Sequence, residues 1–157
     1  MTKTKTFTVH AIAPERVAGI RAARADGHGN ELVPFQAGGG EPLRCCLRTA
    51  DAGESIALIS YAPFETPSPW REVGPVYIHT DECAGHDDDD LPVDLRTGPR
   101  LLRTYRADGT MNYAHNTLVA DGEDIEATVT ALLAESDVAR VHVRTVLPQC
   151  FLYEITE

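Results

Sequence analysis

The residues best suited to chemistry lie in one short run, Arg44-Cys45-Cys46-Leu47-Arg48. Its alternation of apolar and polar residues predicts a strand, in which successive side chains point to opposite faces. Arg44, Cys46 and Arg48 would then share one face, while Cys45 would join the core as a small apolar residue. Nearby cations lower the pKa of a thiol and favour the reactive thiolate. We therefore predict Cys46 as a nucleophile or redox thiol, with Arg44 and Arg48 as ligands for an anion.

Further polar side chains alternate with apolar ones in other predicted strands: Tyr77 and His79, Arg103 and Tyr105, and His142 and Arg144. If these strands are neighbours, one face of the sheet carries Arg, Cys, His and Tyr, which suits a carboxylate or a phosphate. His79 would be a general acid or base, and Arg144 a further anion ligand. The alternative is a solvated face without a site, because antiparallel sheets often leave one face in water.

Metal binding is a separate possibility. His79 and Cys83 are four residues apart, and Cys150 offers another thiol from a distant strand. Imidazole and thiolate are ligands that suit zinc. The chain has no Cys-x-x-Cys pair, however, and the spacing differs from the standard zinc patterns. The cofactor is left undefined, and the alternative is that Cys83 and Cys150 are structural thiols.

Length and charge restrict the classes of function. The 157 residues fit a single domain, residues 1–157. The formal net charge of −10 argues against nucleic acid and against an anionic membrane surface. The first 48 residues carry seven Lys or Arg and four Asp or Glu, so a small anionic ligand is still compatible with the charge. With no secretory signal, no membrane span and no disulfide pattern, the sequence predicts a cytoplasmic protein with reduced thiols.

The elements that position these residues follow from periodicity and turn signals. Helices are predicted from residue 14 to about residue 27 and over residues 123–135. Strands are predicted at residues 6–12, 42–50, 56–61, 76–80, 101–106, 110–119, 138–146 and 151–155, with a weaker candidate at 32–35. Residues 81–94 contain seven acidic residues and predict a long solvated loop. Because strands mostly follow strands, we expect an α+β fold with a largely antiparallel sheet of seven or eight strands and two helices packed on one face.

Several motifs together resemble the bacterial family catalogued as domain of unknown function 1203. The resemblance rests on residues 42–48, Gly53-Glu54, residues 60–64, residues 74–79, Cys83, residues 141–144 and Cys150-Phe151. It covers nearly the whole chain and implies a stand-alone bacterial protein, but no established reaction. Its shortlist of important residues is Arg44, Cys46, Arg48, Tyr61, His79, Cys83, Arg144 and Cys150, which adds Tyr61 as a ligand-binding residue. The chain departs from the family pattern after Cys83, where His86 stands in place of an expected tyrosine.

Three hypotheses follow, in order of preference. The first is a small enzyme or binding protein for a small anionic metabolite, with the Arg residues as ligands and Cys46 and His79 as catalytic groups. The second is a non-catalytic interaction domain that forms a homodimer. The third is a zinc-type domain that uses His79, Cys83 and one further thiol. The sequence does not decide whether the protein is an enzyme.

Overall fold

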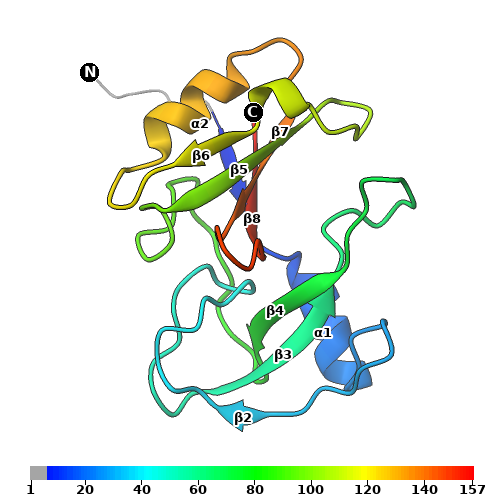
Figure 1. Ribbon diagram of the computed structural model, residues 1–157. Coiled ribbons are helices and arrows are strands. Elements are labelled where there is room, and N and C mark those ends of the chain that lie inside the picture. The colour runs from blue at the N-terminus through cyan, green and yellow to red at the C-terminus, as the bar shows by residue number, and fades with distance from the viewer. Residues whose placement is uncertain (1–6) are drawn as a thin grey trace.

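The computed structural model describes residues 7–157, which form eight strands, two α-helices and one short 3-10 helix. The strands make two antiparallel sheets, one with the order β1-β8-β7-β5-β6 and one with the order β2-β3-β4. Figure 1 shows the five-stranded sheet with α2 in the upper half of the molecule, and the three-stranded sheet with α1 in the lower half. The predicted α+β class is therefore confirmed, with the strands divided between two sheets that each have their own helix.

The five-stranded sheet consists of β1 (Thr8–His10), β5 (Arg100–Tyr105), β6 (Thr117–Val119), β7 (Arg140–Arg144) and β8 (Phe151–Thr156). Helix α2 (Glu126–Leu133) buries Val129, Leu132 and Leu133 in the core cluster that contains the apolar residues of β7 and β8. The predicted hairpin around Asp108-Gly109 is confirmed, because β5 pairs with β6. Strand β6 is shorter than predicted, since the 3-10 helix Tyr113–His115 precedes it.

The three-stranded sheet consists of β2 (Phe35–Gln36), β3 (Ser55–Tyr61) and β4 (Gly74–His79). Helix α1 (Pro14–Ala23) begins with a proline, whose missing N–H costs nothing in the first turn. It ends at Arg24, which adopts a left-handed conformation with φ 53°, and so it is shorter than predicted. Val17 and Ile20 of α1 share a core cluster with the apolar side of β3.

The strand predicted over residues 42–50 is wrong. Pro42 pairs with Thr49 in an antiparallel bridge, and Leu43 and Leu47 N–H groups donate to Arg48 O and Leu43 O at 2.9 Å, which closes a tight reversal. We call residues 43–48 the hairpin loop. Leu47 has φ 58°, a conformation that costs about 1–2 kcal/mol in a residue with a side chain. Leu47 is only 2% exposed, and burial of a leucine stabilises the fold by about 1.5–3 kcal/mol, which offsets this cost.

The alternation of apolar and polar residues led to a wrong strand prediction. Both leucines of the hairpin loop are buried, as the pattern indicates, but they do not lie on one face of a strand. Leu43 joins the core beneath the three-stranded sheet, while Leu47 joins the core of the five-stranded sheet. The loop therefore lies between the two halves of the molecule. The pleat argument that placed Cys45 opposite Cys46 does not apply to it.

Two further predictions have simple outcomes. Residues 81–94 form no helix or strand, as predicted for a long loop. The predicted first strand began at residue 6, which lies outside the described residues; the observed β1 is shorter. Within residues 7–157, neither helix has the length and apolar character needed to cross a bilayer.

Candidate metal centre

The hairpin loop is docked on the end of β4. Arg44 N–H donates to Tyr77 O at 2.9 Å, and Leu43 forms a parallel bridge with the same tyrosine. His79 N–H donates to Cys45 Sγ at 3.3 Å. These contacts hold the two adjacent cysteines against the last residue of β4.

Four side chains converge at this point: Cys45, Cys46, His79 and Cys83, which we call the sulfur–histidine cluster. Their ligand atoms all lie within 4.8 Å of one another. His79 Nδ1 is 3.4 Å from Cys45 Sγ and 3.7 Å from Cys46 Sγ. Zinc with bonds of about 2.3 Å to sulfur and 2.0–2.1 Å to nitrogen in a tetrahedron requires S···N separations of about 3.6 Å. The observed distances bracket that value.

A carboxylate orients the imidazole from the other side. His79 Nε2 lies 3.2 Å from both Glu54 Oε1 and Arg48 Nη2. In the tautomer that donates from Nε2 to Glu54, the Nδ1 lone pair is directed at the sulfurs. Glu54 reaches His79 because Ile56 and His79 are paired across β3 and β4, which makes residue 54 a diagonal neighbour. Arg48 binds both carboxylate oxygens of Glu54, at 2.9 Å for Oε2. This ion pair lowers the pKa of Glu54 to about 2 and keeps it an acceptor.

The sulfurs accept hydrogen bonds from groups that favour thiolates. The backbone N–H groups of Arg48 and Gly85, each two residues after its cysteine, help to lower the pKa values of Cys46 and Cys83. Gly85 has φ 73°, a left-handed conformation that glycine adopts without strain and that turns the chain back toward Cys83. The Arg21 guanidinium of α1 donates to Cys83 Sγ at 3.6 Å. Donors and positive charge around a thiol favour its ionised form.

Hydrogen bonds between the side chains of the cluster shift their pKa values. A hydrogen bond from the Cys45 thiol lowers the pKa of Cys46 to about 6, and the same bond, together with burial, raises the pKa of Cys45. Burial acts to lower the pKa of His79, but hydrogen bonds with Cys83 and Glu54 outweigh it and raise that pKa above 6.5. Burial opposes ionisation of Cys83, yet the N–H and guanidinium donors lower its pKa. Metal binding displaces protons, and thiols of lowered pKa release them more easily.

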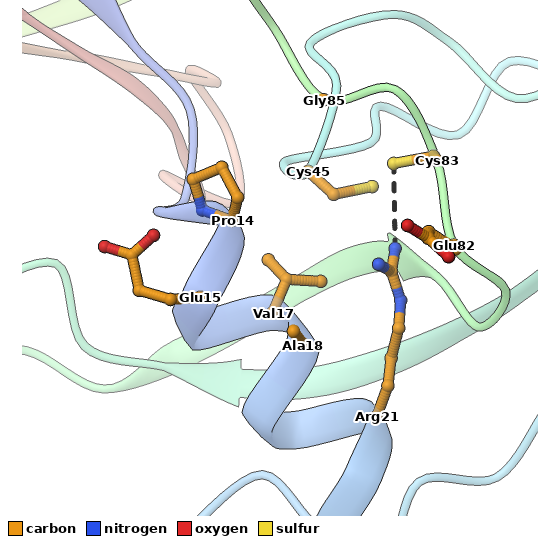
Figure 2. A pocket seen from close by; sticks show the side chains of 9 residues that line it. All are labelled: Pro14, Glu15, Val17, Ala18, Arg21, Cys45, Glu82, Cys83 and Gly85. Carbon is orange, nitrogen blue, oxygen red and sulfur yellow. Dashed lines mark hydrogen bonds between the residues drawn. The ribbon is translucent and has the colours of Figure 1, made fainter.

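Two pockets give access to the cluster. One has a volume of about 530 Å³ between α1 and the sulfurs of Cys45 and Cys83. Figure 2 shows Arg21 extending from α1 to the Cys83 sulfur, with the Cys45 side chain beside them. The other, of about 640 Å³, is lined by Cys46, His79 and Glu54 among others. A solvated ion could therefore reach the cluster.

A second group of possible ligands is His115, Glu135 and Asp137. It contains no sulfur, its two carboxylates are exposed, and His115 Nε2 already lies 3.3 Å from Asp137 Oδ1. Exposed acidic groups of this kind are common on protein surfaces and do not by themselves indicate a metal.

A family model described as a protein of unknown function (DUF1203) matches residues 40–157. This chain belongs to the DUF1203 family. No curated protein and no solved structure matches it. The matched region of this DUF1203 member contains all four residues of the sulfur–histidine cluster as well as Glu54, whereas Arg21 lies before it.

The structure divides the predicted site residues into two groups. In this DUF1203 chain, Cys46, His79, Arg48 and Cys83 come together at the cluster. The others do not belong to it: Arg44 is buried with its Nε donating to Phe151 O at 2.7 Å, and Tyr61, Arg144 and Cys150 line a separate pocket. The single face that was predicted to unite them does not exist, because the strands belong to two sheets.

Sequence reasoning missed three contributors to the DUF1203 cluster. Cys45 was assigned to the core, and it is indeed only 4% exposed, yet its sulfur faces His79. Glu54 and Arg21 were assigned no role. The position of Glu54 follows from the register of β3 and β4, in which Ile56 is paired with His79. Arg21 carried no such signal, since its position depends on how α1 packs on the sheet.

Proposed function

We propose that the protein binds one zinc-type ion through Cys45, Cys46, Cys83 and His79. The observation that carries the proposal is the position of His79 Nδ1, 3.4 and 3.7 Å from two sulfurs with a third ligand atom within 4.8 Å. Those separations match the S···N edges of a tetrahedral zinc site.

The surroundings of His79 support the same conclusion. Histidine ligands of zinc commonly donate their second N–H to a carboxylate, which fixes the ring and raises its basicity. Glu54 is placed to accept that proton, and Arg48 holds Glu54 in turn. The chain thus provides both the ligands and their hydrogen-bonded support.

The donor set favours a soft or borderline metal. Thiolate and imidazole select zinc or a similar ion over calcium and magnesium, which prefer oxygen. Three thiolates and a divalent ion leave a net charge of −1. Arg21, 3.6 Å from Cys83 Sγ, is close enough to balance it, while Arg48 is paired with Glu54. Reduced thiols of this kind suit the reducing interior of a cell, which agrees with the predicted cytoplasmic location.

Four protein ligands fill a tetrahedral shell and leave no position for a substrate, the pattern of structural zinc sites. In this protein the ion would fasten the hairpin loop and the loop that contains Cys83 to the end of β4. The role is therefore metal binding that stabilises the junction between the two halves of the molecule.

The alternative, a Cys46 nucleophile with His79 as base, uses the same pair of atoms at 3.7 Å. It requires one thiol, however, and gives no role to the sulfurs of Cys45 and Cys83. The metal proposal accounts for all three, and for this reason we prefer it over the anion-binding enzyme suggested by the sequence.

Elemental analysis of the purified, reduced protein tests the proposal. We expect one zinc per chain, and after its removal we expect one Co²⁺ to bind with the absorption of tetrahedral cobalt–thiolate coordination. Substoichiometric zinc, iron and copper, together with failure to take up zinc or cobalt, would contradict it.

A further inference from the structure

A second candidate site lies on the five-stranded sheet, apart from the cluster. Arg103 of β5 and Arg144 of β7 project into a pocket of about 460 Å³. Their side chains are only 13% and 7% exposed. Two buried guanidiniums are costly unless anions compensate them.

The chain supplies one anion of its own. Glu72, from the loop between β3 and β4, accepts from Arg103 at 2.8 Å with each oxygen and lies 2.9 Å from Arg144 with Oε2. The remaining contacts are neutral, with Gln149 accepting from both arginines. One carboxylate thus faces two guanidiniums, and its own side chain is 48% exposed.

Two observations indicate that Glu72 does not fully satisfy the charge and the donors of the arginines at this pocket. Arg144 Nε is buried and has no hydrogen-bond partner within residues 7–157. A third cation is near, because the buried Arg44 donates through Nε to the carbonyl oxygen of Phe151, a residue in the wall of the same pocket, at 2.7 Å. Positive charge thus gathers around this pocket, although the protein as a whole has a formal net charge of −10.

The remaining walls of the pocket define the type of ligand. They are mostly apolar or aromatic and include Tyr61, Val73, Pro75, Pro148 and Phe151. A pocket with paired guanidiniums and apolar walls suits a planar anion attached to an apolar body.

We propose that this pocket binds a small carboxylate with an apolar body, and that Glu72 takes the place of the ligand's carboxylate when the ligand is absent. The chain's own side chain then shows how a carboxylate sits between Arg103 and Arg144. The exposed loop that contains Glu72 withdraws to admit the ligand. The site is independent of the zinc-type centre, because the two share no residue.

Benzoate is the probe, with binding measured by calorimetry at constant ionic strength. Glu72→Ala removes the internal competitor, so benzoate should bind about tenfold or more tightly than in the wild type. It should also raise the melting temperature of this variant, whose arginines have lost their counter-ion. Glu65→Gln, in the same loop but paired with Arg16, is the control and should behave as wild type.

A second pair of variants separates this site from incidental binding. Glu72→Gln keeps the shape of the side chain and should show the same direction of change if the alanine variant is too unstable to titrate. Adding Arg144→Gln to either variant should abolish the gain. Equal benzoate affinity in wild type and both Glu72 variants, a gain that survives Arg144→Gln, or a gain for inorganic phosphate alone would overturn the proposal. Zinc content is measured on the same samples, so failure here is distinguishable from failure of the metal proposal.

Discussion

Two histidines in this molecule, His79 and His142, each have a glutamate beside Nε2, but their surroundings differ. His79 Nε2 lies 3.2 Å from Glu54, and His142 Nε2 lies 2.7 Å from Glu154. The Nδ1 of His79 faces thiols, whereas the Nδ1 of His142 is buried and has no partner in the described part of the chain.

The His142 ring is enclosed by aromatic side chains. It stacks on Phe64 at 4.9 Å between centroids and contacts Tyr105 and Phe151 at 4.7 and 5.1 Å. Within residues 7–157 the ring is fully buried, and its contacts are these three rings and the carboxylate of Glu154. A buried His–carboxylate pair is therefore no sign of function by itself; the group at the second ring nitrogen makes the difference.

The strongest test of this contrast removes one thiol from the cluster. Cys83→Ser should weaken zinc binding by more than about 100-fold, because the loss of a ligand exceeds the 10–100-fold effect of losing a ligand's hydrogen-bond partner. Cys150→Ser, in the other pocket, should leave the affinity unchanged. Competition with a chromophoric chelator measures both. Equal affinities in the two variants would remove Cys83 from the site.

The second test addresses the buried histidine. His142→Ala leaves a cavity beneath Phe64 and removes one of the hydrogen-bond partners of Glu154, so the free energy of unfolding should fall by about 3 kcal/mol. Zinc content should stay at one per chain. Denaturant unfolding measures the free energy of unfolding, and elemental analysis measures the zinc content. A His142→Ala variant of normal stability that has lost its zinc would contradict the assigned roles of the two histidines.

The third test compares the two carboxylates. Glu54→Gln should weaken zinc binding by about 10–100-fold, since it disturbs the partner of a ligand and frees Arg48. Glu154→Gln makes the same change beside His142 and serves as the matched control. If both variants bind zinc as the wild type does, Glu54 has no part in the centre.

The smallest expected effect is a difference in pH dependence, of order 1 kcal/mol. Burial lowers the pKa of His142, so its contribution to stability is present above pH 6.5 and is lost as the pH falls below it. The pKa of His79 is raised, because hydrogen bonds with Cys83 and Glu54 outweigh burial. Its contribution is present below pH 6.5 and is lost as the pH rises through the raised pKa.

Metal-free protein with Cys46→Ser is the background for this measurement, since the thiol of Cys46 titrates in the same range. His142→Gln should reduce the loss of unfolding free energy as the pH falls below 6.5. His79→Gln should reduce the loss as the pH rises above 6.5. A reduced loss on the same side of pH 6.5 in both variants would contradict the assigned directions.

Much of the fold was accessible from sequence patterns, because most elements obey one local rule. The apolar run at residues 56–61 gave β3, and Asp108-Gly109 gave the β5–β6 hairpin. The strand predicted over residues 42–50 was wrong, because alternation of apolar and polar residues only indicates which residues are buried. Leu43 and Leu47 are buried in different cores, and no local pattern distinguishes that from a strand.

The candidate site was accessible only in part. Cys46, His79, Arg48 and Cys83 were singled out by type, but their meeting point depends on a loop docked on β4 by contacts between residues far apart in the chain. The same long-range packing separates Arg144 and Tyr61 from them. The predicted homodimer and the cytoplasmic location stay predictions.

The central claim is that three sulfurs and His79 share one ion. X-ray absorption at the zinc edge of the 1:1 protein tests it most directly. We predict three sulfurs at about 2.3 Å and one nitrogen at about 2.0–2.1 Å. A shell of nitrogen and oxygen alone, or one with fewer than three sulfurs, would contradict the account.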